Sequence, residues 1–471
     1  MTYPLIVALL VALGTGLVVA AAGWPRDRLH WALVAGTGLF VGLLAGALLA
    51  GLLMPAETAR LPLRVAIAAF LLAAASWSFA FLRRPAPAAA LPPAAPTPRA
   101  RLAWWALLAL VVLHLVPLVC EVWLRPAYPW DAWATWLIKP RAWFLSGRFA
   151  SYVDPSAWLA TEGTRTMVGW NYPELSAWLQ LLLAQARGAW EEPLLLLPWL
   201  ALLLALLTGV YAVSRRLGVG ALPALLAVYG LVSMPLIDSH VALAGYLDLW
   251  VATAVVFSLA FWLCWLHAPE RRGYLVLAAG FALCLPLLKR EGVVWMVLLV
   301  ALMLYARGGI RWRRRMLGLA LAGLAAGLVL VLGFNETVNG WLVASGLAAS
   351  SHVAEPVRLG WRPGGLAIVA ASFGADNWHL LFLAVLLALL LRWRSLREDP
   401  QARLVGLFLA SGWIFLLLLF CLTPASSWAQ SQTAAHRLVM HLVPATVLWL
   451  VLMLRDSPNP SRTAAGTAGV R

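Results

Sequence analysis

Residues 102–144 of the chain contain LAWWALLALVVLHLVPLVC (102–120) and, a few residues later, PWDAWATWLIKPRAWF (129–144). The first segment has no charged residue and is close to the roughly 20 residues that a helix needs to cross a bilayer. The second segment crowds tryptophans around one aspartate, Asp131, and tryptophan prefers the boundary between lipid and water. Together they predict a spanning helix followed by a segment that lies along the membrane surface and holds a carboxylate there.

The composition of the whole chain supports the same class of protein. Hydrophobic residues make up 63% of the 471 residues and charged residues 11%, against roughly 25% charged in ordinary globular domains. We predict an all-α polytopic membrane protein with about 13 transmembrane helices. The predicted spans are 4–22, 31–53, 61–82, 102–120, 194–213, 221–236, 246–267, 273–288, 292–306, 315–334, 379–392, 403–421 and 434–454.

The formal net charge of +16 would suggest a nucleic-acid partner in a soluble protein. Here the arginines sit in short loops between apolar runs, where they orient the chain by the positive-inside bias. We therefore expect membrane lipids around the chain and no nucleic acid. The basic loops alternate correctly only if the N-terminus lies outside and the C-terminus inside.

Two further segments define the expected organisation. The apolar stretch 175–186 would make only about 18 Å of helix, so we predict a re-entrant or partial helix that accompanies interfacial helices in a large first outer loop. Residues 83–101 are rich in Pro and Ala and predict a stiff, extended cytoplasmic linker. The predicted domains are an N-terminal three-helix unit (1–82), this linker, a transmembrane catalytic module (102–454) and a disordered cytoplasmic tail (455–471).

With this topology, the ionisable residues that the positive-inside bias leaves unexplained all fall on the outer side. Ionisable groups within or beside spans are costly and usually mark function, so we expect one shared, partly buried outer cavity. The chemistry that fits it is transfer from a lipid-anchored phosphate donor. A carboxylate would deprotonate an acceptor hydroxyl, and cations would stabilise the phosphate leaving group.

The candidate residues follow from these two roles. Asp131 is the predicted base and Asp248 a second catalytic carboxylate that organises the site. The predicted phosphate or donor ligands are Lys289, Arg290, Arg437 and Lys139, with Glu174, Glu291 and His240 in support.

Structural alternatives exist for several of these residues. Asp131 is also well placed as the N-cap of an interfacial helix, and Glu174 could occupy the first turn of the short helix. Arg437 could extend its side chain to the interface, and His436 and His441 could be packing residues.

The layout of residues 102–454 resembles the GT-C superfamily of polyprenyl-phosphate-sugar-dependent glycosyltransferases, which includes protein O-mannosyltransferases and lipid A aminoarabinose transferases. The matching elements, in order, are the acid in Trp-Asp-Ala-Trp (130–133), the Pro-containing motif at 171–179, Tyr-Leu-Asp (246–248), Lys-Arg-Glu-Gly (289–292), and Arg437 with Pro444. The first-loop acid is single where relatives carry a pair, so no metal ligand is predicted.

The resemblance implies an inverting glycosyltransferase that needs no cofactor. It implies a polyprenyl-phosphate-linked sugar as donor, a lipid, glycan or protein as acceptor, and a bacterial inner membrane location with the site facing the exterior. One alternative is an enzyme like the O-antigen ligases or polymerases, which would use the 335–378 loop with His352, Arg358 and Arg362. A secondary transporter is a further alternative, but the chain shows no convincing internal repeat.

Overall fold

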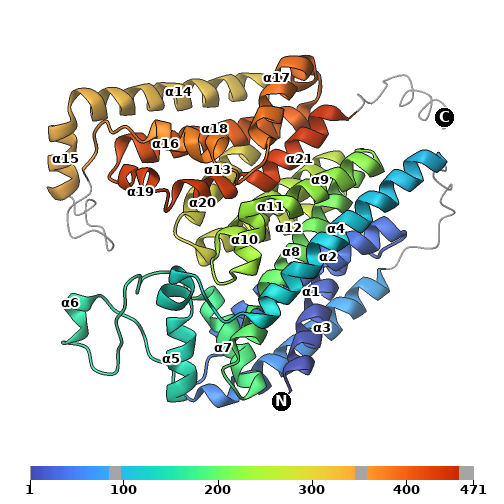
Figure 1. Ribbon diagram of the computed structural model, residues 1–471, viewed down its shortest axis with the longest axis vertical. Coiled ribbons are helices and arrows are strands. Elements are labelled where there is room, and N and C mark those ends of the chain that lie inside the picture. The colour runs from blue at the N-terminus through green and yellow to red at the C-terminus, as the bar shows by residue number, and fades with distance from the viewer. Residues whose placement is uncertain (1, 84–96, 345–357, 456–471) are drawn as a thin grey trace.

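The computed structural model describes residues 2–83, 97–344 and 358–455, and in these ranges its regular structure is helical, without a β-strand. This confirms the predicted all-α class. In chain order (Figure 1) the helices are α1 (Tyr3–Ala22), α2 (Arg28–Leu52), η1 (Thr58–Arg60), α3 (Leu61–Leu82), α4 (Pro98–Leu124), η2 (Ala132–Trp136), α5 (Ile138–Ser146), α6 (Pro155–Trp158), α7 (Leu175–Arg187), α8 (Glu192–Arg216), α9 (Ala221–Ser233), α10 (Pro235–Ala242), α11 (Asp248–His267), α12 (Arg272–Leu288), α13 (Gly292–Arg307), α14 (Ile310–Gly333), α15 (Asn335–Ala344), α16 (Gly365–Val369), η3 (Ala370–Gly374), α17 (Leu381–Glu398), α18 (Pro400–Leu422), α19 (Ser426–Gln430), α20 (Ala435–Met440) and α21 (Val443–Leu454).

Within the described ranges, eight helices are long and apolar enough to cross a membrane: α1, α2, α3 with η1, α4, α8, α11, α14 and α18. They coincide with eight of the thirteen predicted spans. The helices α9 and α10 make a ninth if they are counted as one span with a 60° bend. The helices α12, α13 and α21 are shorter apolar helices, so the count of thirteen stays a prediction.

The basic loops gather at one end of the bundle. Arg216, which ends α8, and Arg271, which precedes α12, both contact the side chain of Tyr274. Arg392 of α17 donates to the carbonyl of Arg455 at the end of α21 (3.1 Å). The 20-residue helix α11 runs from this end to Asp248, a rise of about 30 Å, which matches the thickness of a bilayer core.

The first three helices share the core of the rest of the chain. Phe40 of α2 stacks on Phe281 of α12, with ring centroids 5.6 Å apart, and lies 5.9 Å from both Trp250 and Phe257 of α11. Figure 1 shows α1, α2 and α3 side by side with the helices that follow. The helices α1, α2 and α3 therefore pack as part of one bundle with α8, α11 and α12.

The predicted linker is helical at its C-terminal end, because α4 already begins at Pro98. The Thr97 hydroxyl accepts a hydrogen bond from the Ala100 amide (3.3 Å), and Pro98 suits the first helical position, where its missing N–H has no partner to lose. The extended linker predicted for residues 98–101 is therefore wrong. Residues 84–96 and 456–471, which hold the rest of the predicted linker and most of the predicted tail, lie outside the described residues.

The segment between α4 and α8 forms the predicted large loop. It carries η2, α5 and α6 beyond the end of α4 (Figure 1), and then the 13-residue helix α7. The helix α7 is largely buried and packs against α2 and α5. At about 20 Å in length it is too short to cross a bilayer core, which agrees with the predicted partial helix.

Candidate functional site

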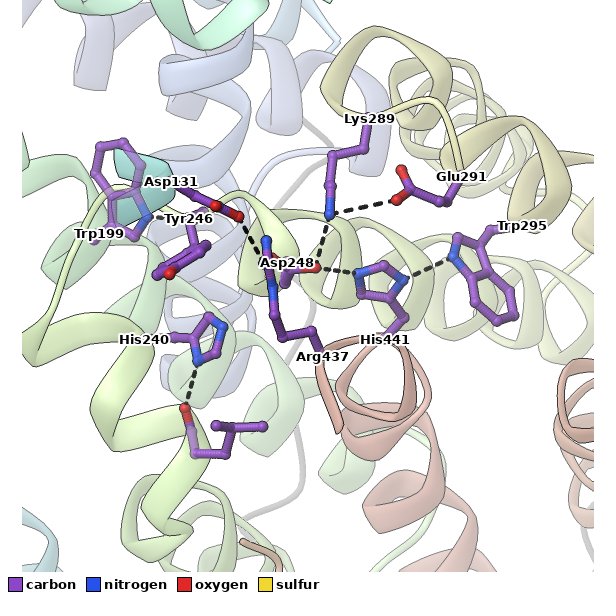
Figure 2. A network of polar contacts seen from close by, with 11 residues as sticks. Asp131, Trp199, His240, Tyr246, Asp248, Lys289, Glu291, Trp295, Arg437 and His441 are labelled. Carbon is purple, nitrogen blue, oxygen red and sulfur yellow. Dashed lines mark hydrogen bonds and ion pairs between the residues drawn. The ribbon is translucent and has the colours of Figure 1, made fainter. Parts of the chain in front are cut away.

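Asp248, the first residue of α11, is fully buried and lies at the centre of a polar network (Figure 2). Its Oδ1 accepts from the Lys289 ammonium (2.9 Å) and from His441 Nε2 (3.1 Å). Its Oδ2 accepts from Nε (3.1 Å) and Nη2 (2.9 Å) of Arg437. A buried carboxylate without partners would lose several kcal/mol of solvation, and these four hydrogen bonds replace the water. The position at a helix N-terminus also favours negative charge.

Arg437 of α20 connects this buried acid to the outer loop. Its Nη1 donates to Asp131 Oδ2 across 2.7 Å, while its other edge holds Asp248. The guanidinium carbon lies 4.3 Å from the ring centroid of Tyr246, which is a cation–π distance. One arginine therefore joins two carboxylates from segments that are distant in the sequence.

His441 supports Asp248 from the far side. The indole N–H of Trp295 on α13 donates to His441 Nδ1 (2.9 Å), and an indole nitrogen can only donate. Nδ1 is therefore the acceptor, and Nε2 carries the proton that goes to Asp248. The neighbouring α13 thus holds the imidazole as its neutral Nε2–H tautomer and fixes its orientation.

Asp131 presents its carboxylate to Arg437 instead of capping a helix. Its backbone is already helical (φ −62°, ψ −29°) and its side chain makes no capping hydrogen bond. An N-cap residue needs extended backbone and a side-chain bond to the next turn, so the capping interpretation is wrong. The carbonyl of Pro129 accepts the amides of Ala132 (3.0 Å) and Trp133 (3.4 Å) in its place.

The turn before α11 brings the Asp131 segment close to Asp248. Gly245 has φ +126°, and a Cβ built on it would lie 2.3 Å from the Cβ of Ala132. Only glycine fits both that backbone conformation and that contact. Trp199 of α8 donates its indole N–H to the carbonyl of Tyr246 (2.6 Å) and so anchors the end of the turn.

Lys139 and Glu174 form a separate pair in the outer loop. The buried Lys139 ammonium donates to Glu174 Oε1 (3.1 Å) and to the carbonyls of Trp170 (2.8 Å) and Tyr172 (3.1 Å). An ammonium has three hydrogens, and these contacts use all of them. Burial lowers the pKa of Lys139, and the Glu174 carboxylate opposes that shift. Lys139 holds the 170–174 turn, and its role as a phosphate ligand stays a prediction.

The remaining predicted residues surround the network. Lys289 lies 3.6 Å from Glu291 Oε1, and Arg290 lies over the ring of Tyr172 with its guanidinium carbon 5.8 Å from the centroid. Among the residues joined by direct contacts, three carboxylates (Asp131, Asp248 and Glu291) therefore face two cations (Lys289 and Arg437).

His240 lies on α10 beside Tyr246, with ring centroids 5.3 Å apart. Its Nδ1 binds the carbonyl of Leu236 (2.8 Å) and its buried Nε2 has no hydrogen-bond partner. Because a carbonyl only accepts, Nδ1 carries the proton.

Five of the nine predicted site residues are joined by direct contacts: Asp131, Asp248, Lys289, Glu291 and Arg437. The sequence places His441 among the outer ionisable residues, with packing as its alternative, but gives no role in the site to His441, Trp295 or Tyr246. The available signal was spacing, since His441 follows Arg437 by four positions and Trp295 follows Glu291 by four, which places such residues on one helical face.

The loop of the alternative assignment is described only in part, because His352 lies outside the described residues. Arg362 donates its amide to the carbonyl of Cys421 (2.8 Å) at the end of α18. Among the described parts of the chain, no three His, Cys, Asp or Glu side chains form a group that could hold a metal ion.

The chain matches no family model, no curated protein and no solved structure.

Proposed function

We propose that the chain is an inverting membrane glycosyltransferase that moves a sugar from a polyprenyl-phosphate donor to an acceptor hydroxyl at the outer face of the membrane. The observation that carries this proposal is the contact between Asp131 and Arg437, which are 306 positions apart and 2.7 Å from each other. A candidate base and a candidate phosphate ligand thus meet at one end of the bundle, in a region where tryptophans gather.

Arg437 is suited to receive the donor phosphate. Its guanidinium has five N–H groups, and three of them are used in the contacts to Asp248 and Asp131. A sugar phosphodiester carries one negative charge, and departure of the sugar leaves a phosphate monoester with a second. A fixed guanidinium with a neighbouring ammonium, Lys289, stabilises that growing charge.

Asp131 is the carboxylate that a bound phosphate would displace from Arg437. Its side chain is 34% exposed and held by Arg437 alone, whereas Asp248 is fully buried with four hydrogen bonds. Since the carboxylates already occupy Lys289 and Arg437, an added anion competes with the more weakly held acid. Phosphate at Nη1 of Arg437 would free Asp131 beside the reacting sugar.

The freed Asp131 then acts as the general base. Its carboxylate takes the proton of the acceptor hydroxyl as that oxygen attacks C1 of the sugar. The bond from C1 to the phosphate oxygen breaks, and polyprenyl phosphate leaves from the opposite face of C1 with both electrons of that bond. Such a single displacement inverts the configuration at C1.

Asp248 is a positioning residue in this scheme, because both of its carboxylate oxygens already accept hydrogen bonds from Lys289, His441 and Arg437. It keeps the two cations at a fixed spacing, and His441 keeps Asp248 in place. Predicted as a catalytic carboxylate, it therefore supports the cations without touching the substrate.

The surroundings of Asp131 suit a substrate that arrives from the membrane. Trp130 and Trp133 are exposed and lie edge to face, with centroids 4.6 Å apart. Exposed tryptophans at the ends of spans favour the lipid headgroup region. We place the site at the outer face of a bacterial plasma membrane, with a lipid, glycan or protein as acceptor.

The test of this proposal is transfer by membrane vesicles that contain the full chain. They receive undecaprenyl-phosphate-linked pentoses and hexoses together with an envelope extract as acceptor. Asp131→Asn should lower transfer by about 100-fold or more, the contribution of a general base, without changing membrane insertion. Asp154→Asn is the matched control, since Asp154 is the partly exposed N-cap of α6 in the same loop. Full transfer by the Asp131→Asn protein would refute the assignment.

A further inference from the structure

A groove lies between α14 and α18. Its volume is about 400 Å³, and its walls are almost entirely apolar. The lining residues on α14 are Gly323, Leu324, Gly327, Leu328 and Val331, and those on α18 are Phe415, Leu418, Leu419 and Leu422.

The helix α14 does not pack closely enough to close this groove. None of its residues is buried, although it is one of the eight helices long and apolar enough to cross a membrane. Glycines on its inner face leave the space open, because a Cβ built on Gly323 or Gly327 would meet no atom within 4 Å. An apolar groove at bilayer depth is favourable only when hydrocarbon fills it.

One end of the groove is charged. Leu359 closes it there, held by Asn339 of α15, whose side chain binds both the amide (2.7 Å) and the carbonyl (2.9 Å) of Leu359. Arg358 is exposed next to Leu359, and Arg362 follows three positions later. The Nε of Arg362 is buried without a hydrogen-bond partner, and an arginine in that state favours an anion.

We propose that this groove binds one anionic phospholipid of the surrounding bilayer. An acyl chain fills the space between α14 and α18, and the phosphate lies at the charged end with Arg358 and Arg362. The apolar walls account for the chain, and the two arginines account for the sign of the headgroup. Phe415 connects this site to the polar network, since its ring lies 5.5 Å from Trp295, edge to face.

Native mass spectrometry of the full-length protein in detergent tests whether the groove binds an acyl chain. The probes are dioleoyl phosphatidylglycerol and, as the neutral lipid, dioleoyl phosphatidylcholine. An added Cβ at Gly323 or Gly327 meets no atom within 4 Å, so Gly323→Leu and Gly327→Leu should fold. Their side chains would occupy the groove and should weaken phosphatidylglycerol binding about tenfold. Gly318→Leu is the matched control, because Gly318 is an exposed glycine of α14 outside the groove lining. Unchanged binding by the Gly323 and Gly327 variants would overturn the proposal.

The headgroup is tested with the double variant Arg358→Gln/Arg362→Gln. The wild type should prefer phosphatidylglycerol to phosphatidylcholine by about tenfold, and the double variant should bind both equally. Arg148→Gln, in the first outer loop, should keep the preference. Equal binding of the two lipids by the wild type would overturn the choice of an anionic lipid. Displacement of phosphatidylglycerol by equimolar undecaprenyl phosphate would also overturn it, because the groove would then serve the donor.

Discussion

Asp131 and Asp248 share one arginine, yet their surroundings give them different properties. Asp248 is inaccessible and saturated with hydrogen bonds from Lys289, His441 and Arg437. Asp131 is one-third exposed, and its Oδ1 makes no hydrogen bond to the described residues. The first arrangement suits a group that orders its neighbours, and the second suits a group that reacts.

This difference predicts opposite effects on stability. Asp248→Asn would leave the buried Lys289 and the partly buried Arg437 beside a neutral partner, and breaking a buried ion pair costs about 3–5 kcal/mol. Asp131→Asn removes a partly exposed contact, for which about 1 kcal/mol or less is expected. Thermal unfolding in detergent should therefore show a large drop in midpoint for Asp248→Asn only. Equal midpoints for the two variants would contradict the positioning role of Asp248.

At the scale of the elements, the turn between α10 and α11 determines where Asp131 lies. Gly245 adopts a left-handed backbone and touches Ala132, the residue after the proposed base. A side chain there would push η2 away from Arg437.

Gly245→Ala should therefore lower transfer by about 100-fold, the effect of a displacement of about 1 Å on a reacting group. Gly188→Ala separates this effect from backbone strain. Gly188 also has positive φ (+76°), but an added Cβ there meets nothing within 4 Å. Backbone strain should cost both variants about 1–2 kcal/mol of stability. The contact with Ala132 should cost Gly245→Ala more, and only Gly245→Ala should lose transfer. Comparable activity in the two proteins would show that the contact with Ala132 is unimportant.

The sequence predicts the long spans and the charged residues better than it predicts their contacts. Length and hydropathy identify α1 to α4, α8, α11, α14 and α18, because those helices meet the bilayer requirement alone. The short helices α12, α13 and α21 are ambiguous, since packing against other helices substitutes for length. The contacts of Lys139 and Asp131 depend on turns such as 170–174 and 245–247, whose geometry no hydrophobic pattern encodes.

At the scale of the whole molecule, the N-terminal helices pack against α11, the helix that begins with Asp248. Phe40 of α2 packs on Trp250, two residues beyond Asp248, and on Phe281. We therefore expect α1–α3 to help fix the position of α11.

Phe40→Ala should lower the free energy of unfolding by about 3–5 kcal/mol, the usual loss for a buried phenylalanine, and reduce transfer as α11 shifts. Phe70→Ala is the matched control in the same three helices, because Phe70 is 59% exposed on α3. Denaturation of both proteins in detergent measures the difference. If Phe40→Ala unfolds like Phe70→Ala, the N-terminal helices form an independent unit.

The most direct measurement of the central claim is the affinity of the full chain for undecaprenyl phosphate in nanodiscs. In our account, phosphate and Asp131 compete for Nη1 of Arg437. Asp131→Asn should therefore bind this lipid about tenfold more tightly than the wild type, although it fails to transfer sugar. Arg437→Gln should bind about 100-fold more weakly, and Asp154→Asn should bind like the wild type. Weaker binding by Asp131→Asn, or wild-type binding by Arg437→Gln, would contradict the account.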